Sequence, residues 1–234
     1  MKKDFWLSML PVYALVFCGA ILLALWGSRA VAVMSEGAPL TDRVCIILDA
    51  GHGGEDGGAT SCSGVLESNI NLEITLRLND LLHLLGYDTK MIRTTDRSIY
   101  TQGETIAAKK VSDLRERVRI ANETHNAILV SIHQNYFTDP RYSGAQVFYP
   151  ETAGSRELAT QLQAALVSHT DPQSNRQIKK SHGIYLMDKI QCTAVLVECG
   201  FLSNPQEDIR LRSREYQLLL CGILSTTIAN YLES

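Results

Sequence analysis

The sequence predicts a single α/β domain, built on a mainly parallel sheet with helices on both of its faces. Short apolar runs of strand length alternate along the chain with longer segments whose apolar residues recur at helical spacing. The strand runs are apolar throughout, as strands are when both faces of a sheet are covered. The chain contains no internal repeat and no low-complexity tract, so we expect one domain.

The composition excludes several classes of protein. Of the 234 residues, 45% are hydrophobic and 20% are charged, which rules out a disordered or collagen-like chain. The formal net charge of -3 gives no electrostatic reason to expect nucleic-acid binding, and we predict none.

The first half of the expected domain begins with a short apolar run over residues 44–48, which predicts a buried strand followed by a glycine-rich loop. Residues 67–85 repeat Ile and Leu at helical spacing, and Gly86 marks the end of that helix. A strand over 87–94 and a charged helix over 112–125 complete this half.

The second half continues the alternation. The expected strands are 127–133, 145–149, 183–187 and 194–198, and the expected helices are 155–169 and 214–232. Pro205, placed after Ser203 and Asn204, suits the first position of a further helical turn.

The first residues predict export across the cytoplasmic membrane. Lys2 and Lys3 precede an uncharged run over 5–26, and a helix that spans a bilayer needs about 20 apolar residues. The lysines favour an orientation in which they stay in the cytoplasm. Ala30-Val31-Ala32 offers a cleavage site, so a removed signal peptide is the alternative. The expected organisation is an anchor or signal peptide over 1–32, a short linker over 33–42 and the folded domain over 43–234.

Four polar residues stand at points that this topology brings to one edge of the sheet. His52 follows the first strand, while His133 and Glu198 end two later strands. Glu67 opens the first long helix. Two histidines and a carboxylate with an open fourth position make a usual catalytic zinc site, and a carboxylate that binds no metal can act as the general base. The residues alone do not assign these roles, and a structural role for each remains the alternative.

Other chemistries find little support in the sequence. There is no Gly-x-Ser-x-Gly elbow and no Gly-x-x-x-x-Gly-Lys-Ser/Thr loop. Cys199 lies in an apolar strand, so we expect an inert buried thiol. The remaining histidines divide into three that we expect at the surface and one, His182, that can reach the site. The three are His83, His125 and His169.

Several stretches together resemble the zinc-dependent N-acetylmuramoyl-L-alanine amidases of the amidase-3 family. They are Ile47-Leu48-Asp49-Ala50-Gly51-His52-Gly53-Gly54, Glu67-x-x-x-Asn71-Leu72, Arg117-x-x-Ile120-Ala121-Asn122, Val130-Ser131-Ile132-His133 and Leu196-Val197-Glu198-x-Gly200-Phe201-Leu202-Ser203-Asn204-Pro205. The resemblance implies that His52, Glu67 and His133 bind one zinc ion and that Glu198 is the catalytic carboxylate. The implied reaction is hydrolysis of the amide between N-acetylmuramic acid and L-alanine of the peptidoglycan stem peptide.

The resemblance also implies a biological setting. The small size, the single N-terminal segment and residues 131–135 are most similar to sporulation members of the family, which remove stem peptides on the way to muramic-δ-lactam in the spore cortex. We therefore expect an exported protein of the forespore cortex space. Residues 149–183 lack the autoinhibitory helix of some division amidases, so control is expected to come from expression, metal supply or a regulatory partner such as a sporulation lipoprotein. The alternatives are a membrane-tethered peptidoglycan-binding scaffold and a zinc peptidase or deacetylase of another wall bond.

A basic loop is the last feature with two interpretations. Arg176, Lys179 and Lys180 either form a solvated charge run or contact carboxylates of the stem peptide.

Overall fold

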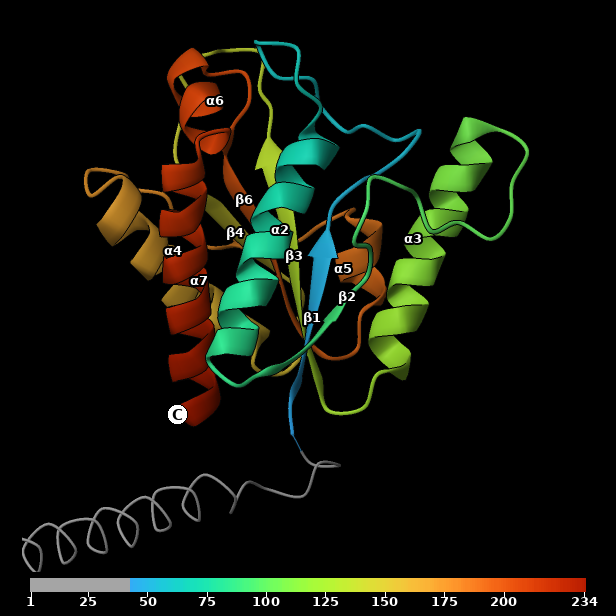
Figure 1. The fold of residues 1–234 in the computed structure, drawn as a ribbon. Helices are drawn as coiled ribbons and strands as arrows, with labels where there is room; N and C mark the ends of the chain where they lie inside the picture. The colour runs from blue at the N-terminus through green and yellow to red at the C-terminus, as the bar shows by residue number, and fades with distance from the viewer. Residues whose placement is uncertain (1–42) are drawn as a thin grey trace, which may run out of the picture. The chain divides into compact units, whose positions relative to one another are not determined.

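A computed structural model describes residues 43–234 of the chain (Figure 1). The expected anchor or signal peptide over 1–32 and the expected linker over 33–42 lie outside the described residues. Within residues 43–234, no helix has both the length and the apolar character needed to cross a membrane.

Six strands form one sheet in the order β2-β1-β3-β6-β4-β5. The strands are β1 (Cys45–Ala50), β2 (Asp88–Met91), β3 (Ala127–Asn135), β4 (Gln146–Tyr149), β5 (Lys179–Lys180) and β6 (Thr193–Phe201). β2, β1, β3 and β6 run parallel, whereas β4 pairs antiparallel with β6 and parallel with β5. The predicted mainly parallel sheet is therefore confirmed, with one reversed edge.

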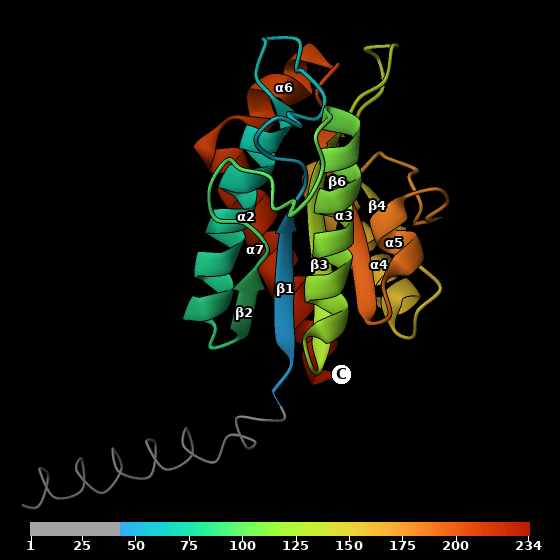
Figure 2. The same cartoon turned by 90° about the vertical axis from the view of Figure 1, so that its right-hand side faces the viewer.

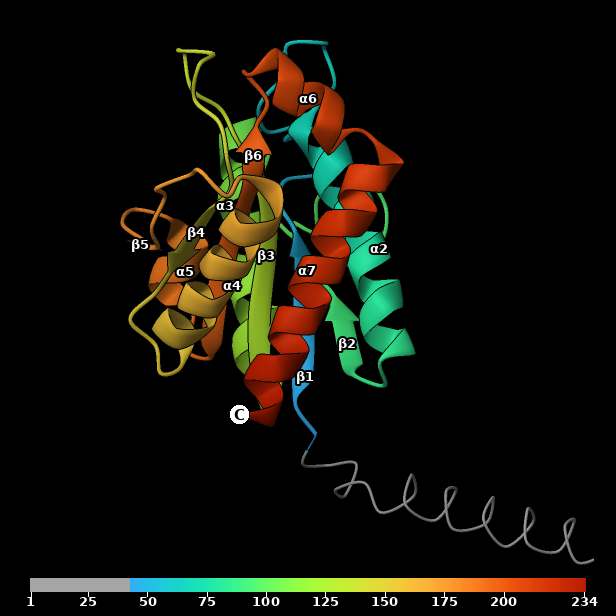
Figure 3. The ribbon, with the colours of Figure 1, turned by 90° about the vertical axis from the view of Figure 1, so that its left-hand side faces the viewer.

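Helices cover both faces of this sheet, as predicted. They are α2 (Glu67–Leu84), α3 (Ile106–Glu123), α4 (Ser155–Thr170), α5 (Tyr185–Lys189), α6 (Pro205–Leu211) and α7 (Arg214–Glu233). The apolar faces of α2, α4 and α7 form one buried cluster with the sheet, and α3 and α5 contribute to a second cluster on the opposite face (Figures 1 and 3). The largely apolar strands β1, β3 and β6 supply side chains to both clusters, which explains why they show no regular polar alternation.

The expected strand over 183–187 is wrong, because this segment contains the helix α5. Gly183 takes a positive φ of 71°, which turns the chain before the helix begins. Leu186, Met187 and Ile190 then lie buried in the cluster shared with α3. The spacing of these three residues fits one helical face better than a strand.

Helix α3 also differs from its expected bounds, because it begins at Ile106 instead of residue 112. Thr105 is the N-cap, and its side chain accepts a hydrogen bond from the backbone of Ala108 at 3.2 Å. The extra turns carry Lys109 and Lys110 to the glycine loop after β1, where they pair with Glu55 and Asp56. Figure 2 shows α3 running alongside β1 and β3 toward that loop.

A buried ion pair joins α3 to the end of β1. Arg117 pairs with Asp49, and each is almost completely buried. Arg117 Nε also donates to Asp113 at 2.6 Å, and the Ser131 hydroxyl donates to Asp49 at 2.7 Å. Burial acts to raise the pKa of Asp49, but Arg117 and Ser131 outweigh it and hold that pKa below its usual value.

We expect Asp49→Asn to lower the free energy of unfolding by about 3–5 kcal/mol at neutral pH, since it leaves the buried Arg117 charge poorly compensated. Because folding lowers the pKa of Asp49, its contribution is complete above the unfolded pKa of about 3.9 and is lost as the pH falls through the folded value. Urea unfolding across pH should therefore show the gap between the two proteins closing below about pH 4.

The matched control is Asp139→Asn, which removes a partly exposed carboxylate from an ion pair with the exposed Arg141. It should leave the free energy of unfolding nearly unchanged. A gap for Asp49→Asn that persists unchanged at acid pH would contradict the electrostatic explanation.

Candidate metal centre and active site

His52 reaches the carboxyl edge of the sheet through an unusual backbone conformation. It follows β1 in the glycine loop and has a positive φ of 61°, which a residue with a side chain rarely adopts. Its carbonyl oxygen accepts a hydrogen bond from Arg117 Nη2 at 2.7 Å, which helps to hold this conformation. Gly51 precedes it, and a Cβ there would overlap the imidazole of His133. The glycine therefore allows the two histidines to approach each other.

Glu67 is the first residue of α2 and is buried. Its Oε2 atom accepts a hydrogen bond from the Ala59 backbone at 3.0 Å. Its Oε1 atom accepts bonds from the Gln134 backbone and the Asn71 side chain, each at 3.1 Å. These three donors fix the orientation of the Glu67 carboxylate independently of the two histidines.

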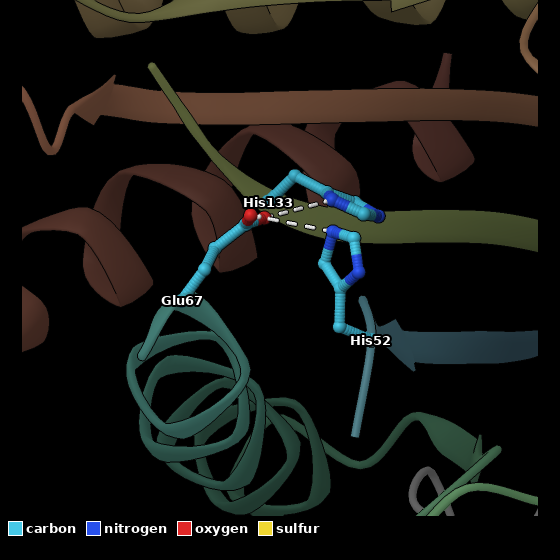
Figure 4. A group of neighbouring side chains, drawn as sticks. All are labelled: His52, Glu67 and His133. Carbon is cyan, nitrogen blue, oxygen red and sulfur yellow. Dashed lines mark hydrogen bonds and ion pairs between the residues drawn. The ribbon is translucent and has the colours of Figure 1, made fainter. Parts of the chain in front are cut away.

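The structure brings His52, Glu67 and His133 together (Figure 4). His52 Nε2 lies 3.3 Å from Glu67 Oε2, and His133 Nδ1 lies 3.0 Å from Glu67 Oε1. The two imidazole rings meet edge to face, with centroids 5.0 Å apart. Three segments far apart in the sequence therefore point their polar atoms at one place.

This donor set fits a zinc ion. Zinc binds histidine nitrogen and carboxylate oxygen at about 2.0–2.2 Å, so two tetrahedral ligands lie roughly 3.4 Å apart. The contacts of Glu67 with His52 and His133 have this spacing, and one atom from each of the three residues lies within 4.8 Å of the others. Three protein ligands leave a fourth position free, as catalytic zinc sites do.

The pKa values of Glu67 and His52 indicate that positive charge is favoured between these side chains. Burial acts to raise the pKa of Glu67, but hydrogen bonds from His133 and His52 hold it well below its usual range. Burial likewise acts to lower the pKa of His52, yet hydrogen bonds to Asp56 and Glu67 raise it to about 9. An ionised carboxylate therefore faces the two imidazoles, which suits the binding of a cation.

Asp56 supports His52 from behind. Its Oδ2 atom lies 3.0 Å from His52 Nδ1, the ring nitrogen that faces away from Glu67. Lys110 of α3 pairs with the same carboxylate at 3.1 Å. A carboxylate on the outer nitrogen of a metal-binding histidine fixes the orientation and tautomer of the ring.

Glu198 lies beside the cluster without joining it. It is directly opposite His133 in the parallel pairing of β3 and β6. Its Oε2 atom is buried and has no hydrogen-bond partner among residues 43–234. Burial raises the pKa of Glu198 to about 7, against the lowering effect of His133. A carboxylate with such a pKa can accept and return a proton near neutral pH.

The other histidines stand apart from this cluster within the described part of the chain. His83 lies in the last turn of α2, His125 follows α3 and His169 lies in the last turn of α4. His182 lines a different hollow with Lys180 and Asp188, so it does not complete the group.

Sequence reasoning assigned no role to three residues that hold the cluster in place, namely Asp56, Asn71 and Gln134. Asn71 follows Glu67 by four positions, and helical spacing alone places two such residues on one face. Asp56 and Gln134 act through contacts that only the folded loop and strand create.

Comparison with known proteins agrees with this geometry. The family described as N-acetylmuramoyl-L-alanine amidase matches residues 46–229. The germination-specific N-acetylmuramoyl-L-alanine amidase of Bacillus subtilis (strain 168) is 36% identical over 195 residues, which cover 82% of this chain and 81% of that protein.

Solved structures show the same fold. The CwlD amidase from Clostridioides difficile, solved in complex with the GerS lipoprotein, is 37% identical with a TM-score of 0.77, covering 81% of this chain and 98% of that one. An N-acetylmuramoyl-L-alanine amidase from Clostridium difficile 630 is 27% identical with a TM-score of 0.71, covering 82% and 98%. The chain therefore belongs to the N-acetylmuramoyl-L-alanine amidase family and is an amidase of peptidoglycan.

Proposed function

We propose that this amidase is zinc-dependent, that His52, Glu67 and His133 hold the ion, and that Glu198 moves the proton. One observation carries the proposal. Two imidazole nitrogens and a fixed carboxylate converge within 4.8 Å, and a carboxylate with an unpartnered buried oxygen lies on the neighbouring strand. The first group suits a metal, and the second suits acid–base chemistry.

The residues divide the work of hydrolysis between them. Zinc, when bound, supplies polarisation of the amide carbonyl and acidification of water. Glu198 accepts the proton from the attacking water and returns it to the nitrogen of L-alanine as the amide bond breaks. Asp56 and Asn71 keep His52 and Glu67 in orientation while this occurs.

The biological setting is also part of the proposal. The similarity to a germination-specific amidase and to the CwlD amidase supports a role in the maturation of spore cortex. Because the substrate is cell wall, the domain acts outside the cytoplasmic membrane, anchored or released after export. The GerS lipoprotein bound to the CwlD amidase supports a lipoprotein as regulatory partner.

The direct test is mass spectrometry of purified peptidoglycan after incubation with the full chain in detergent, with and without added zinc. We expect free stem peptides that begin with L-alanine, released only when zinc is present. Release that is equally fast after exhaustive chelation would contradict zinc dependence. Cleavage at another wall bond would contradict the site proposed for the reaction.

Two substitutions separate metal binding from proton transfer. Glu198→Gln should lower kcat at least about 100-fold while bound zinc stays near one ion per chain, since it removes a proton carrier but no ligand. His133→Ala should lose both activity and zinc. Metal analysis beside the activity assay distinguishes the two, and full activity of the Glu198 variant would overturn the mechanism.

Removal of the contact between Asp56 and His52 should weaken zinc binding without abolishing it. Asp56→Asn should weaken zinc affinity by about 10- to 100-fold, because the outer nitrogen of His52 loses its carboxylate partner. Glu55→Gln is the matched control, because Glu55 is the neighbouring carboxylate and its one ion pair within residues 43–234 is with Lys109. Competition with a zinc-binding dye measures both affinities. Equal affinities in the two variants would show that Asp56 has no such role.

A further inference from the structure

A polar groove of about 830 Å³ lies at one end of the sheet and takes no part in the mechanism described above. It is lined by the loop between β3 and β4, the start of β4, and the loop between α4 and β5. The β3–β4 loop projects beyond the carboxyl edge of the sheet (Figure 2), and β4 and β5 form the edge of the sheet nearest to it (Figure 3).

The groove begins one strand away from Glu198. Gln146 lines it and is directly opposite Glu198 in the antiparallel pairing of β4 with β6. Neighbouring strands are about 4.8 Å apart. Because β4 runs in the reverse direction, its first residue lies at the edge where β6 carries Glu198. A ligand in the groove therefore lies beside the carboxylate that moves the proton.

Arg176 is held in this groove by neutral partners. Its Nε donates to the Ser143 carbonyl at 2.7 Å, and its Nη1 donates to Gln146 Oε1 at 3.4 Å. Its guanidinium lies 4.7 Å from the centre of the Phe201 ring. These contacts fix a half-buried cation, yet within residues 43–234 it has no carboxylate partner.

Two nearby cations differ in this respect, whereas Lys179, an exposed side chain that lines the groove, forms no ion pair within residues 43–234 either. Arg141, which also lines the groove, pairs with Asp139 at 2.6 Å, and Lys180 outside the groove pairs with Glu151. Asp171 lines the groove as well but forms no ion pair with Arg176 in the described structure. Arg176 acts electrostatically on Glu207 but forms no ion pair with it, and a fixed guanidinium without a paired carboxylate suits the binding of a carboxylate from a ligand.

We propose that Arg176 binds a free carboxylate of the stem peptide one residue beyond L-alanine. This rests on the function proposed above, because it assumes that the bond is cut beside Glu198. In peptidoglycan the second stem residue is D-glutamate linked through its side chain, so its α-carboxylate is either free or amidated. That carboxylate lies roughly 7 Å from the cut amide, at about 3.5 Å per residue. Arg176 lies at a comparable separation from Glu198, because it hydrogen-bonds to Gln146 on the strand next to that of Glu198, and neighbouring strands are about 4.8 Å apart.

The test uses the zinc-loaded full chain in detergent and two soluble muropeptides that differ only in a free or amidated D-glutamate α-carboxyl group. Wild type should prefer the free form by about 10- to 100-fold in kcat/KM, as expected for a charge-assisted hydrogen bond. Arg176→Gln should remove this preference, mainly through a higher KM for the free form. Arg176→Lys should restore part of it.

Lys180→Gln is the matched control, because it removes the same charge four residues away outside the groove. It should leave the preference intact. Equal loss on both muropeptides in Arg176→Gln would assign Arg176 a merely structural role and overturn the proposal, as would a wild type without preference.

A binding measurement keeps this result separate from the function proposed above. Calorimetric titration with the stem peptide itself, free or amidated at D-glutamate, requires no turnover. Wild type should bind the free peptide about tenfold or more tightly than the amidated one, and Arg176→Gln should not discriminate. If wild type cuts neither muropeptide, the proposed function fails, while this comparison still decides whether Arg176 binds the carboxylate.

Discussion

The buried ion pair between Arg117 and Asp49 anchors the loop on which the rest of the site depends. Arg117 also donates to the carbonyls of Ala50 and His52, and Arg93 donates to the carbonyls of Ala50 and Gly51. The loop backbone is thus held by two arginines that reach it from different parts of the chain. This support allows His52 to keep a left-handed conformation that would otherwise be unfavourable.

Two glutamates of the site differ through their surroundings. Glu67 accepts hydrogen bonds from the Ala59 and Gln134 backbone and from Asn71, so its charged form is stabilised. Glu198 has a buried oxygen without a partner, so its charged form is disfavoured. Pairs of carboxylates whose environments separate their pKa values commonly divide the roles of ligand and proton carrier. Both side chains are glutamates, so the difference between their pKa values comes from the surroundings that the fold gives them.

The reversed strand β4 gives the site its asymmetry. On one side of Glu198, β3 places His133 opposite it, and the glycine loop and α2 bring His52 and Glu67 to His133. On the other side, β4 starts at Gln146 and continues a groove bounded by two loops. A parallel strand in the position of β4 would end at this edge, whereas β4 begins there. The loop that leads into β4 therefore forms one wall of the groove.

The sequence by itself determined the α/β class, the mainly parallel sheet and the four polar residues at its carboxyl edge. Hydrophobic periodicity is local, and parallel strands bring their ends to one edge whatever their separation in sequence. Only the tertiary structure decided that residues 185–189 form a helix, because a segment this short leaves helix and strand undecided until Leu186 and Met187 are buried against the α3 side of the sheet. It also decided the partners of His52, since Asp56 and Arg117 act through contacts that no local pattern encodes.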